Sequence, residues 1–327
     1  MNQTLDLALV FINWNGRRDC EGALAAVRAQ RPAPREVVVV DNGSSDGSLE
    51  WFLSQGDVFV VANGANLGFA KAANQGIRVT SSALVMLCNL DVRLADGFLE
   101  TAVARVLSAP DVGSVGGLLL REGGGGIVDS AGHVLHRSGW VSNRGQGGPD
   151  HFKQPEEVFG VTAAAAVYRR EMLTDVALDG EVFCERFFAY LEDVDLDWRA
   201  RWRGWRSYLE PAARATHRRG GSGLHQTAMI ERHVLANRAL LWMRNAPRSW
   251  VVGPGAASAT GLILLRAGLA ARRHPLALLG LADAARSSPE VIRARRQIMS
   301  RRRVPDSEME RWAEPTPWKS LVAPHLR

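Results

Sequence analysis

The sequence lacks the short motifs that identify many nucleotide-binding and redox proteins. Its three cysteines form no Cys-x-x-Cys pair, no Gly-x-Gly-x-x-Gly fingerprint follows the first apolar segment, and no lysine-containing P-loop is present. A Rossmann dinucleotide site and a P-loop site are therefore excluded, and the glycine run 123–126 is interpreted as a flexible loop. We expect the cysteines to be buried, reduced thiols of a cytoplasmic protein.

A secretory leader and long apolar runs are lacking as well. Residues 1–6 contain no basic region, and the apolar run 7–12 is too short for a signal peptide. The uncharged run between Arg248 and Arg266 is interrupted by glycine, proline, serine and threonine. It is therefore marginal as a membrane-spanning helix, which needs about 20 strongly apolar residues.

Positive charge is concentrated in one part of the chain. The net charge is +6, but residues 266–303 hold ten arginines and only two acidic residues, which leaves the rest slightly acidic. Leucine clusters alternate with these arginines, a pattern typical of helices on an anionic membrane surface, here the inner face of the cell membrane. A helical extension packed on the rest of the chain, or on a second subunit, explains the pattern equally well. A nucleic-acid patch is disfavoured because no known reader fold accompanies it.

Short apolar segments alternate with helical patterns in the first part of the chain. Strands are predicted at residues 7–12, 37–40 and 58–62 and within 83–92, with helical segments between them. Strands that alternate with helices form parallel β-α-β units, so we predict an α/β fold with a doubly wound, mostly parallel sheet. A further strand is expected over residues 158–168, where small side chains leave room for close packing.

The segment 83–92 carries polar side chains where its strand ends. Asn89 and Asp91 follow the apolar residues, at the edge where open α/β sheets bind ligands. A carboxylate at this place suits a divalent cation that also binds phosphate oxygens. A cap for the helix expected over 97–107 is the alternative, but Asp96 stands directly before that helix and is the better cap.

Asp41 follows the strand 37–40 in the same way and precedes several turn-forming residues. A carboxylate can accept the imide N–H of uracil or thymine, whereas it would repel a diphosphate. Asp41 is therefore predicted to contact a nucleobase. The alternative is that it only shapes the turn through its own backbone.

An acidic segment follows the aromatic run 187–190. Glu192 and Asp193 come at its end, and a helix is expected to begin near Asp193. The helix dipole and local pairing explain Asp195 and Asp197. An apolar wall raises the pKa of a carboxylate and makes it a stronger base, so Glu192 and Asp193 are the catalytic candidates.

Together these segments resemble the family-two inverting glycosyltransferases, which have the GT-A fold and use nucleotide-diphosphate sugars. The rhamnosyltransferase-like branch is the most similar. The segments occur in the family's order within residues 7–223, and they are Asn13-Trp14-Asn15, Val39 to Ser48, Asn66 to Ala70 with Asn74, Asn89-Leu90-Asp91, and Tyr190 to Asp195.

The resemblance implies a role for each matching position. Asp193, with Glu192 beside it, would be the catalytic base. Asp91 would bind the metal-diphosphate, and His217 would be a further ligand of Mg²⁺ or Mn²⁺. The donor, such as dTDP-rhamnose or a UDP-sugar, would be bound by Asn13, Asn15, Asp41, Asn42, Asn66, Gly68, Asn74, Asn89 and Asp91. The implied acceptor is a lipid-linked precursor of a cell-surface glycan.

Two positions depart from the family pattern. Asn89 stands where the family often has aspartate, and a neutral amide is a weaker metal ligand than a carboxylate. The metal would then be held mainly by Asp91, His217 and the substrate's own phosphates. Cys184 stands where related sequences usually have aspartate, and we expect no catalytic consequence from it.

The predicted organisation is a GT-A catalytic domain over residues 1–235 and a helical, arginine-rich extension over residues 236–327. Two other functions stay open. A nucleotidyltransferase that makes sugar nucleotides needs a glycine-rich loop with Arg or Lys after the first strand, and Asn13-Trp14-Asn15-Gly16 does not supply one. A non-catalytic protein that binds sugar nucleotides would bind the donor without turnover.

Overall fold

The computed structural model describes residues 4–219, 228–251 and 254–317. Its main body is a ten-stranded sheet, in the order β10-β12-β6-β11-β4-β1-β2-β3, with β5 paired to β12 and β7 paired to β6. The strands are β1 (Thr4–Asn13), β2 (Ala33–Asp41), β3 (Phe59–Ala62), β4 (Leu84–Asn89), β5 (Val92–Leu94), β6 (Val112–Arg121), β7 (Val128–Ser130), β10 (Glu156–Val158), β11 (Ala165–Arg169) and β12 (Arg206–His217).

The four N-terminal strands confirm the predicted parallel arrangement. β1 lies between β2 and β4, β3 pairs with the other edge of β2, and all three pairings are parallel. The apolar runs of β1 and β4 are almost fully buried, as expected for strands covered on both faces. β11 joins β4 and β6 in antiparallel register, so the sheet is mixed beyond β4.

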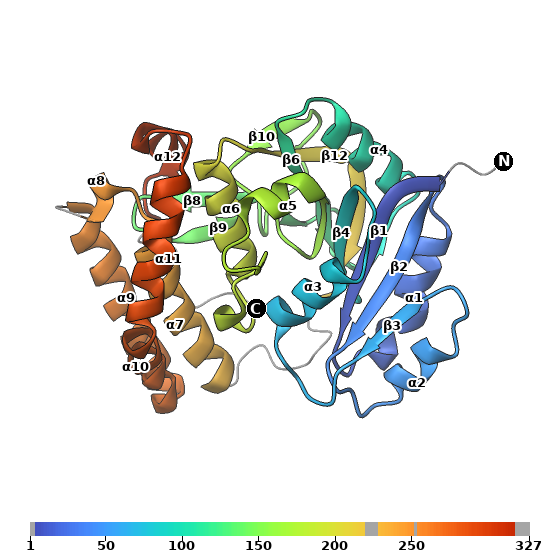
Figure 1. Ribbon diagram of the computed structural model, residues 1–327, viewed down its shortest axis with the longest axis horizontal. Helices are drawn as coiled ribbons and strands as arrows, with labels where there is room; N and C mark the ends of the chain where they lie inside the picture. The colour runs from blue at the N-terminus through green and yellow to red at the C-terminus, as the bar shows by residue number, and fades with distance from the viewer. Residues whose placement is uncertain (1–3, 220–227, 252–253, 318–327) are drawn as a thin grey trace.

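Helices cover both faces of this sheet (Figure 1). One face packs against one group of helices and the opposite face against another, which creates two apolar layers. The first group is α1 (Arg17–Arg28), α2 (Ser48–Leu53) and α4 (Phe98–Leu107), and the second is α3 (Phe69–Arg78), α5 (Arg170–Val176) and α6 (Glu192–Trp202).

The predicted cap of α4 is wrong. The helix begins at Phe98 after Gly97, whose φ of 76° lies in the left-handed region, and no side chain caps its first turn. Glycine adopts this conformation without the steric cost that a Cβ atom imposes. The chain turn before the helix is therefore made by Gly97, and not by a hydrogen bond from Asp96.

The segment 158–168 is not one strand, so that prediction is also wrong. β10 ends at Val158, β11 begins at Ala165, and the intervening residues leave the ladder. Two of their backbone N–H groups donate to carboxylates of α6 instead, Val161 to Asp197 and Ala163 to Asp193. A buried backbone donor needs a partner, and here the partner is a side chain of a distant helix.

The remaining helices form a layer beside α6, on the left in Figure 1. They are α7 (Ala228–Asn245), α8 (Arg248–Val251), α9 (Pro254–Arg273), α10 (Leu279–Arg286), α11 (Ser288–Arg301) and α12 (Asp306–Trp312), with the short 3₁₀ helices η1 (Glu185–Phe187) near α6 and η2 (Pro275–Leu278) before α10. A small second sheet joins β8 (His133–His136), β9 (Val141–Asn143) and β13 (Ala313–Glu314).

A third apolar core links this layer of helices to α6, which packs on the main sheet. Trp198 and Trp202 of α6 are fully buried among residues of α7 and α11. Helix α7 also runs across residue 235, so the predicted domain boundary falls inside a helix, and the division of the chain stays a prediction. No helix in the described ranges is long and apolar enough to cross a bilayer.

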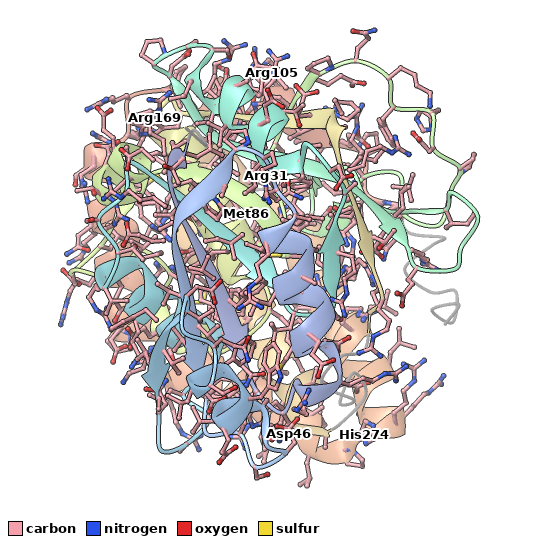
Figure 2. All side chains as sticks on the ribbon, turned by 90° about the vertical axis from the view of Figure 1, so that its right-hand side faces the viewer. Arg31, Asp46, Met86, Arg105, Arg169 and His274 are labelled. Atoms are coloured by element: carbon pink, nitrogen blue, oxygen red, sulfur yellow. The ribbon has the colours of Figure 1, made fainter. Side chains whose placement is uncertain are left out.

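The parallel strands give the sheet two distinct ends, and the labelled residues in Figure 2 show where these ends lie. Arg31, Arg105 and Arg169 lie toward one end, and Met86 of β4 lies in the interior. Asp46, which follows β2, lies at the opposite end, beyond the carboxyl ends of the parallel strands. The candidate site residues are found at this second end.

Candidate active site

The turn after β2 is built around the buried side chains of Asn13 and Asp41. The amide of Asn13 donates to Oδ2 of Asp41 over 2.6 Å and to the Ser48 hydroxyl over 2.8 Å. Oδ1 of Asp41 accepts the backbone N–H groups of Gly43 and Ser44 at 3.0 and 2.9 Å. Both carboxylate oxygens thus shape the turn, which is the alternative weighed for Asp41. Its contact with a nucleobase stays a prediction.

The next turns interlock through asparagine side chains. Oδ1 of Asn15 accepts the backbone N–H of Ser45 at 2.8 Å, and the amide of Asn42 donates to the carbonyl of Gly68 at 3.1 Å. Oδ1 of Asn66 accepts the Gly68 N–H at 2.9 Å. These bonds hold the loops that follow β1, β2 and β3 against one another, at the edge where a donor is expected.

Gly68 and Asn74 lie on the side of this edge that faces the aromatic segment. A Cβ atom on Gly68 would lie 2.6 Å from the Phe188 ring, so only glycine allows the approach. The Asn74 amide donates to the carbonyl of Phe183 at 2.8 Å, and its oxygen accepts the Phe183 N–H at 2.9 Å. Asn74 therefore braces the segment that leads to α6, and its contact with a nucleotide stays a prediction.

Asp91 and His217 meet at the end of the sheet, as the resemblance implied. Nε2 of His217, the last residue of β12, lies 3.2 Å from Oδ1 of Asp91. Its Nδ1 lies 2.8 Å from Oδ2 of Asp129 in β7, and Arg219 contacts the other oxygen of Asp129. Burial alone would lower the His217 pKa, but hydrogen bonds and charges of Asp129 and Asp91 raise that pKa to about 9.

A short backbone bridge connects this pair to the acidic helix. The N–H of Asn89 donates to the carbonyl of Ala164 over 2.9 Å. The N–H of Ala163 donates to Oδ2 of Asp193 over 3.2 Å. Asp193 is 15% exposed, at the first turn of α6. The predicted base and the predicted diphosphate site are thus held by neighbouring residues of one segment.

His133 of β8 lies between two carboxylates of α6. Its Nδ1 is 2.7 Å from Oδ2 of Asp197, and its Nε2 is 3.7 Å from Oδ2 of Asp193. Burial raises the pKa of Asp197 to about 6, against the opposing effect of His133. Burial alone would lower the pKa of His133, but the two carboxylates raise it. Asp197 and His133 are thus an ion pair buried beside the candidate base.

Glu192 differs from Asp193 in its surroundings. Its side chain is 6% exposed, and Oε2 has no hydrogen-bond partner in the described part of the chain. Burial, together with the charge of Asp193, raises the pKa of Glu192 well above its usual value. Burial disfavours the ionised form of Glu192, and Asp193 is the more exposed of the two carboxylates, so the geometry favours Asp193 as the base.

Asp195 is a structural residue of this helix. It is fully buried and contacts the guanidinium groups of Arg199 and Arg244 and the amide of Asn245. Burial would raise its pKa, but the two arginines outweigh burial and lower it. The predicted pairing of Asp195 with Arg199 is confirmed, and the added partners tie α6 to α7.

The donor set near Asp91 fits a divalent cation that also binds phosphate. A histidine whose Nδ1 donates to a carboxylate presents Nε2 as a ligand once Nε2 has lost its proton, and Asp129, His217 and Asp91 have this order. A cation bound here would displace that proton. No group of three or more His, Cys, Asp or Glu in the described ranges could hold a metal alone. Phosphate oxygens of the donor would therefore have to complete the coordination.

No local sequence pattern identifies Asp129 or His133 as a site residue. Each is a single residue in a segment without clear periodicity, and each meets its partner across 88 or 64 positions of the chain. The sequence around them, Val128 to His136, carries no signal beyond short strands. Only the fold brings them to the site.

The chain matches the family model described as Glycosyl transferase family 2 over residues 10–176, which is more than half of its length. It is 25% identical over 307 residues to the N-acetylglucosaminyl-diphospho-decaprenol L-rhamnosyltransferase of Mycobacterium tuberculosis. That match covers 84% of this chain and 97% of the relative.

Solved structures are similar to the fold. A mannosyltransferase from Pyrobaculum calidifontis, in complex with GDP-Man and Mn²⁺, superimposes with a TM-score of 0.53 and 15% identity, covering 91% of this chain and 86% of that one. S. aureus TarS in complex with UDP-GlcNAc superimposes with a TM-score of 0.52 and 15% identity, covering 89% and 91%. The chain therefore belongs to glycosyl transferase family 2, and it is an inverting glycosyltransferase with the GT-A fold.

Proposed function

We propose that this glycosyltransferase moves a hexose from a nucleotide-diphosphate sugar, dTDP-rhamnose or a UDP-sugar, to a hydroxyl group of a lipid-linked glycan precursor. The rhamnosyltransferase relative, whose name specifies a diphospho-decaprenol acceptor, supports a lipid-linked acceptor and a role in cell-wall polysaccharide synthesis. The structures similar in fold were solved with GDP-Man or UDP-GlcNAc and so support the donor class.

One observation carries the proposal. Asp193, a carboxylate with some access to solvent, is joined through Ala163 and Ala164 to the strand end that bears Asn89 and Asp91. A base on one side and a diphosphate site on the other suit an attack on the anomeric carbon opposite the leaving group. Neither a nucleotidyltransferase nor a non-catalytic binding protein needs this pairing.

The reaction requires a base, a site that holds the donor and a group that stabilises the leaving diphosphate. Asp193 accepts the proton of the acceptor hydroxyl as its oxygen attacks the anomeric carbon, and the bond to the nucleoside diphosphate breaks. General base assistance of this kind contributes roughly 10²–10⁴ in rate. The loops around Asn13, Asn42 and Asn66 hold the donor. One displacement inverts the anomeric centre.

A divalent cation, Mg²⁺ or Mn²⁺, would neutralise charge that develops on the leaving diphosphate. Asp91 and His217 are the residues that would hold it, with Asp129 orienting the imidazole. Structures similar in fold that were solved with Mn²⁺ support the use of a divalent cation.

The helical extension offers a surface for the membrane that would present a lipid-linked acceptor. Leu264 of α9 and Leu276 of η2 are 61% and 66% exposed. Arg272 and Arg273, at the end of α9, are exposed beside them in sequence. Arginines at headgroup level and leucines below them would bind an anionic surface reversibly. Packing of α7 and α11 on α6 supports the alternative of a helical extension for those two helices.

A screen of donors tests the proposed reaction. Purified protein is incubated with dTDP-rhamnose, UDP-sugars and GDP-sugars, with Mg²⁺ or Mn²⁺, and with a polyprenyl-diphosphate sugar as acceptor. We expect one donor to yield a product of increased mass whose new glycosidic bond has the anomeric configuration opposite to the donor's. Donor binding with no product from any acceptor would favour the non-catalytic binding protein.

Sedimentation with liposomes tests the membrane proposal. The protein should sediment with anionic vesicles at low salt and release as ionic strength rises, because salt screens the arginine contribution. Arg272→Gln together with Arg273→Gln should weaken binding without changing donor affinity. Arg18→Gln, at the start of α1 and far along the chain from the extension, is the matched control. No sedimentation at any salt concentration would contradict the proposal.

A further inference from the structure

The ion pair of His133 and Asp197 is buried directly behind the candidate base. His133 is 5% exposed and Asp197 is 2% exposed. Asp193 and Asp197 are four positions apart on α6, so both point from the same face of the helix toward His133. Removing His133 and Asp197 from water, close to a third ionisable side chain, Asp193, costs free energy. Helix α6 would form without this cluster.

The backbone around the pair is shaped to admit it. A Cβ atom on Gly160 would overlap the Asp197 carboxylate, so this position accommodates only glycine. The carbonyl of Gly160 accepts the N–H of His133 at 2.8 Å, and the N–H of Val161 donates to Oδ1 of Asp197 at 3.3 Å. Both ends of the pair are thus fixed by the segment that also donates to Asp193 through Ala163.

The charged groups around His133 belong to α6. Asp193 and Asp197 face it, and Arg201 interacts through its charge with Asp197. Tyr168 of β11 lies near Asp193, Asp197 and Glu192, and burial together with their charges raises its pKa. Burial raises the pKa values of Glu192 and Tyr168 and so disfavours their charged forms. The imidazolium of His133 therefore faces two carboxylates, Asp197 in hydrogen-bond contact and Asp193 at 3.7 Å.

We propose that His133, held by Asp197, is a positioning residue that keeps the Asp193 carboxylate turned toward the acceptor hydroxyl. This inference rests on the proposed role of Asp193 as the base. Oδ2 of Asp193 is directed inward by the N–H of Ala163 and by Nε2 of His133. A carboxylate has about four lone-pair positions, so acceptor-facing lone pairs stay available when these inward ones are used.

The proton balance of the step is simple. The acceptor hydroxyl loses its proton to Asp193 as the new carbon–oxygen bond forms and the bond to the diphosphate breaks. His133 exchanges no proton in this step. Its positive charge lies 3.7 Å from Oδ2 of Asp193 and fixes the direction of that side chain.

Two substitutions separate the two contacts of the imidazole. His133→Asn places an amide nitrogen near the position of Nδ1, so it retains the bond to Asp197 and loses the contact with Asp193. His133→Gln reaches the position of Nε2 and retains the contact with Asp193. The control is His136→Asn, on the same strand and equally buried, whose ring contacts Ser142 and the Pro315 carbonyl instead of the acids.

We expect His133→Asn to lower kcat about tenfold or more, still less than the loss caused by Asp193→Asn, with the donor Kd unchanged. The acidic limb of the kcat–pH profile should move to higher pH, because an ionised carboxylate loses a neighbouring cation. His133→Gln should recover part of kcat, and His136→Asn should leave kcat and the profile unchanged. The donor Kd reports whether each variant is folded. If His133→Asn does not fold, the same shift of the limb is expected in Asp197→Asn.

An unchanged kcat and profile in folded His133→Asn, alongside an inactive Asp193→Asn, would overturn this inference and leave the proposed function standing. So would an equal fall of kcat at every pH, which indicates a structural role. Full activity of Asp193→Asn would instead overturn the proposed function itself.

Discussion

His217 and His133 are both imidazoles that lie between two carboxylates, but the two sites are assembled differently. The His217 site draws its carboxylates from separate parts of the sheet, Asp91 after β4 and Asp129 in β7. The His133 site draws both carboxylates from one helix, α6. A set gathered from several strands can surround a ligand, whereas two acids on one helix face can only hold what lies against that face.

The charges nearby differ in the same sense. Arg219 contacts Asp129 beside His217, and Arg218 contacts Asp19 next to it, so cations accompany the donor side. The charged groups that face His133 directly are the carboxylates of Asp193 and Asp197, and burial disfavours the charged form of the neighbouring Glu192. One arrangement suits a diphosphate and its cation, and the other suits a group that must remain an ionised base. Similar chemistry therefore serves two tasks.

The largest expected effect breaks the base side alone. Asp193→Asn should lower kcat by roughly 10²–10⁴, since the amide cannot accept a proton, while the donor Kd changes little. Steady-state transfer and calorimetry of nucleotide binding measure the two quantities. Glu192→Gln is the control, because burial disfavours the charged form of Glu192 and the substitution keeps its shape. A comparable loss of donor affinity in Asp193→Asn would make it a structural residue.

The next effect breaks the donor side alone. Asp91→Ala should abolish the tightening of nucleoside-diphosphate binding by Mn²⁺, and His217→Ala should weaken that tightening, because both would ligate the cation. Titrations with and without Mn²⁺ measure the difference for each variant. Nucleotide binding that tightens equally in wild type and both variants would remove the proposed metal site.

A smaller effect tests the space behind the base. Gly160→Ala should displace the Asp197 carboxylate, since its Cβ would occupy the same space. Overpacking of this kind costs about 1–3 kcal/mol of stability. We expect thermal unfolding at a lower temperature together with a lower kcat. Gly56→Ala is the control for an added Cβ, because a Cβ there meets nothing within 4 Å and, as at Gly160, φ is not positive. A loss of stability with kcat intact would show that Asp197 can move without cost to catalysis.

The smallest effect concerns the nucleobase. If Asp41 accepts the imide N–H of a pyrimidine, uridine and thymidine diphosphates should bind more tightly than cytidine diphosphate, whose N3 is an acceptor. The expected difference is modest because both oxygens of Asp41 already accept hydrogen bonds from the protein. Competition binding with the three nucleotides measures it. Equal affinities would leave Asp41 only its role in the turn.

The predictable part of the fold is the part with strong local patterns. Two short apolar runs predict strands from their local pattern alone, Val37 to Val40 and Leu84 to Leu87. The polar residues that follow these strands must then reach one edge of the sheet. The meeting of Asp91 with His217 follows from that edge once the family resemblance supplies the histidine. The expectation of buried cysteines holds for Cys20 and Cys88, whereas Cys184 is only partly buried.

The rest depended on contacts that no local pattern encodes. Residues 159–164 have the composition of a strand, but Val161 and Ala163 donate their N–H groups to acids that lie 36 and 30 positions later in the chain. Its position near the start of a helix predicts only a local role for Asp197. The fold places His133 against it. Long-range partners of single polar residues decide such cases, and they become visible only when the chain is folded.

The most direct test compares the two carboxylates that hold the two histidines, through Asp129→Asn and Asp197→Asn. Donor affinity with Mn²⁺ and the single-turnover rate at saturating donor are measured for both variants. We expect each substitution to affect a different one of these two quantities. Asp129→Asn should weaken metal-dependent donor binding about 10–100-fold with a smaller change in rate, and Asp197→Asn should lower the rate with donor binding intact. The same proportional loss of both quantities in both variants would contradict the separation of the two sites.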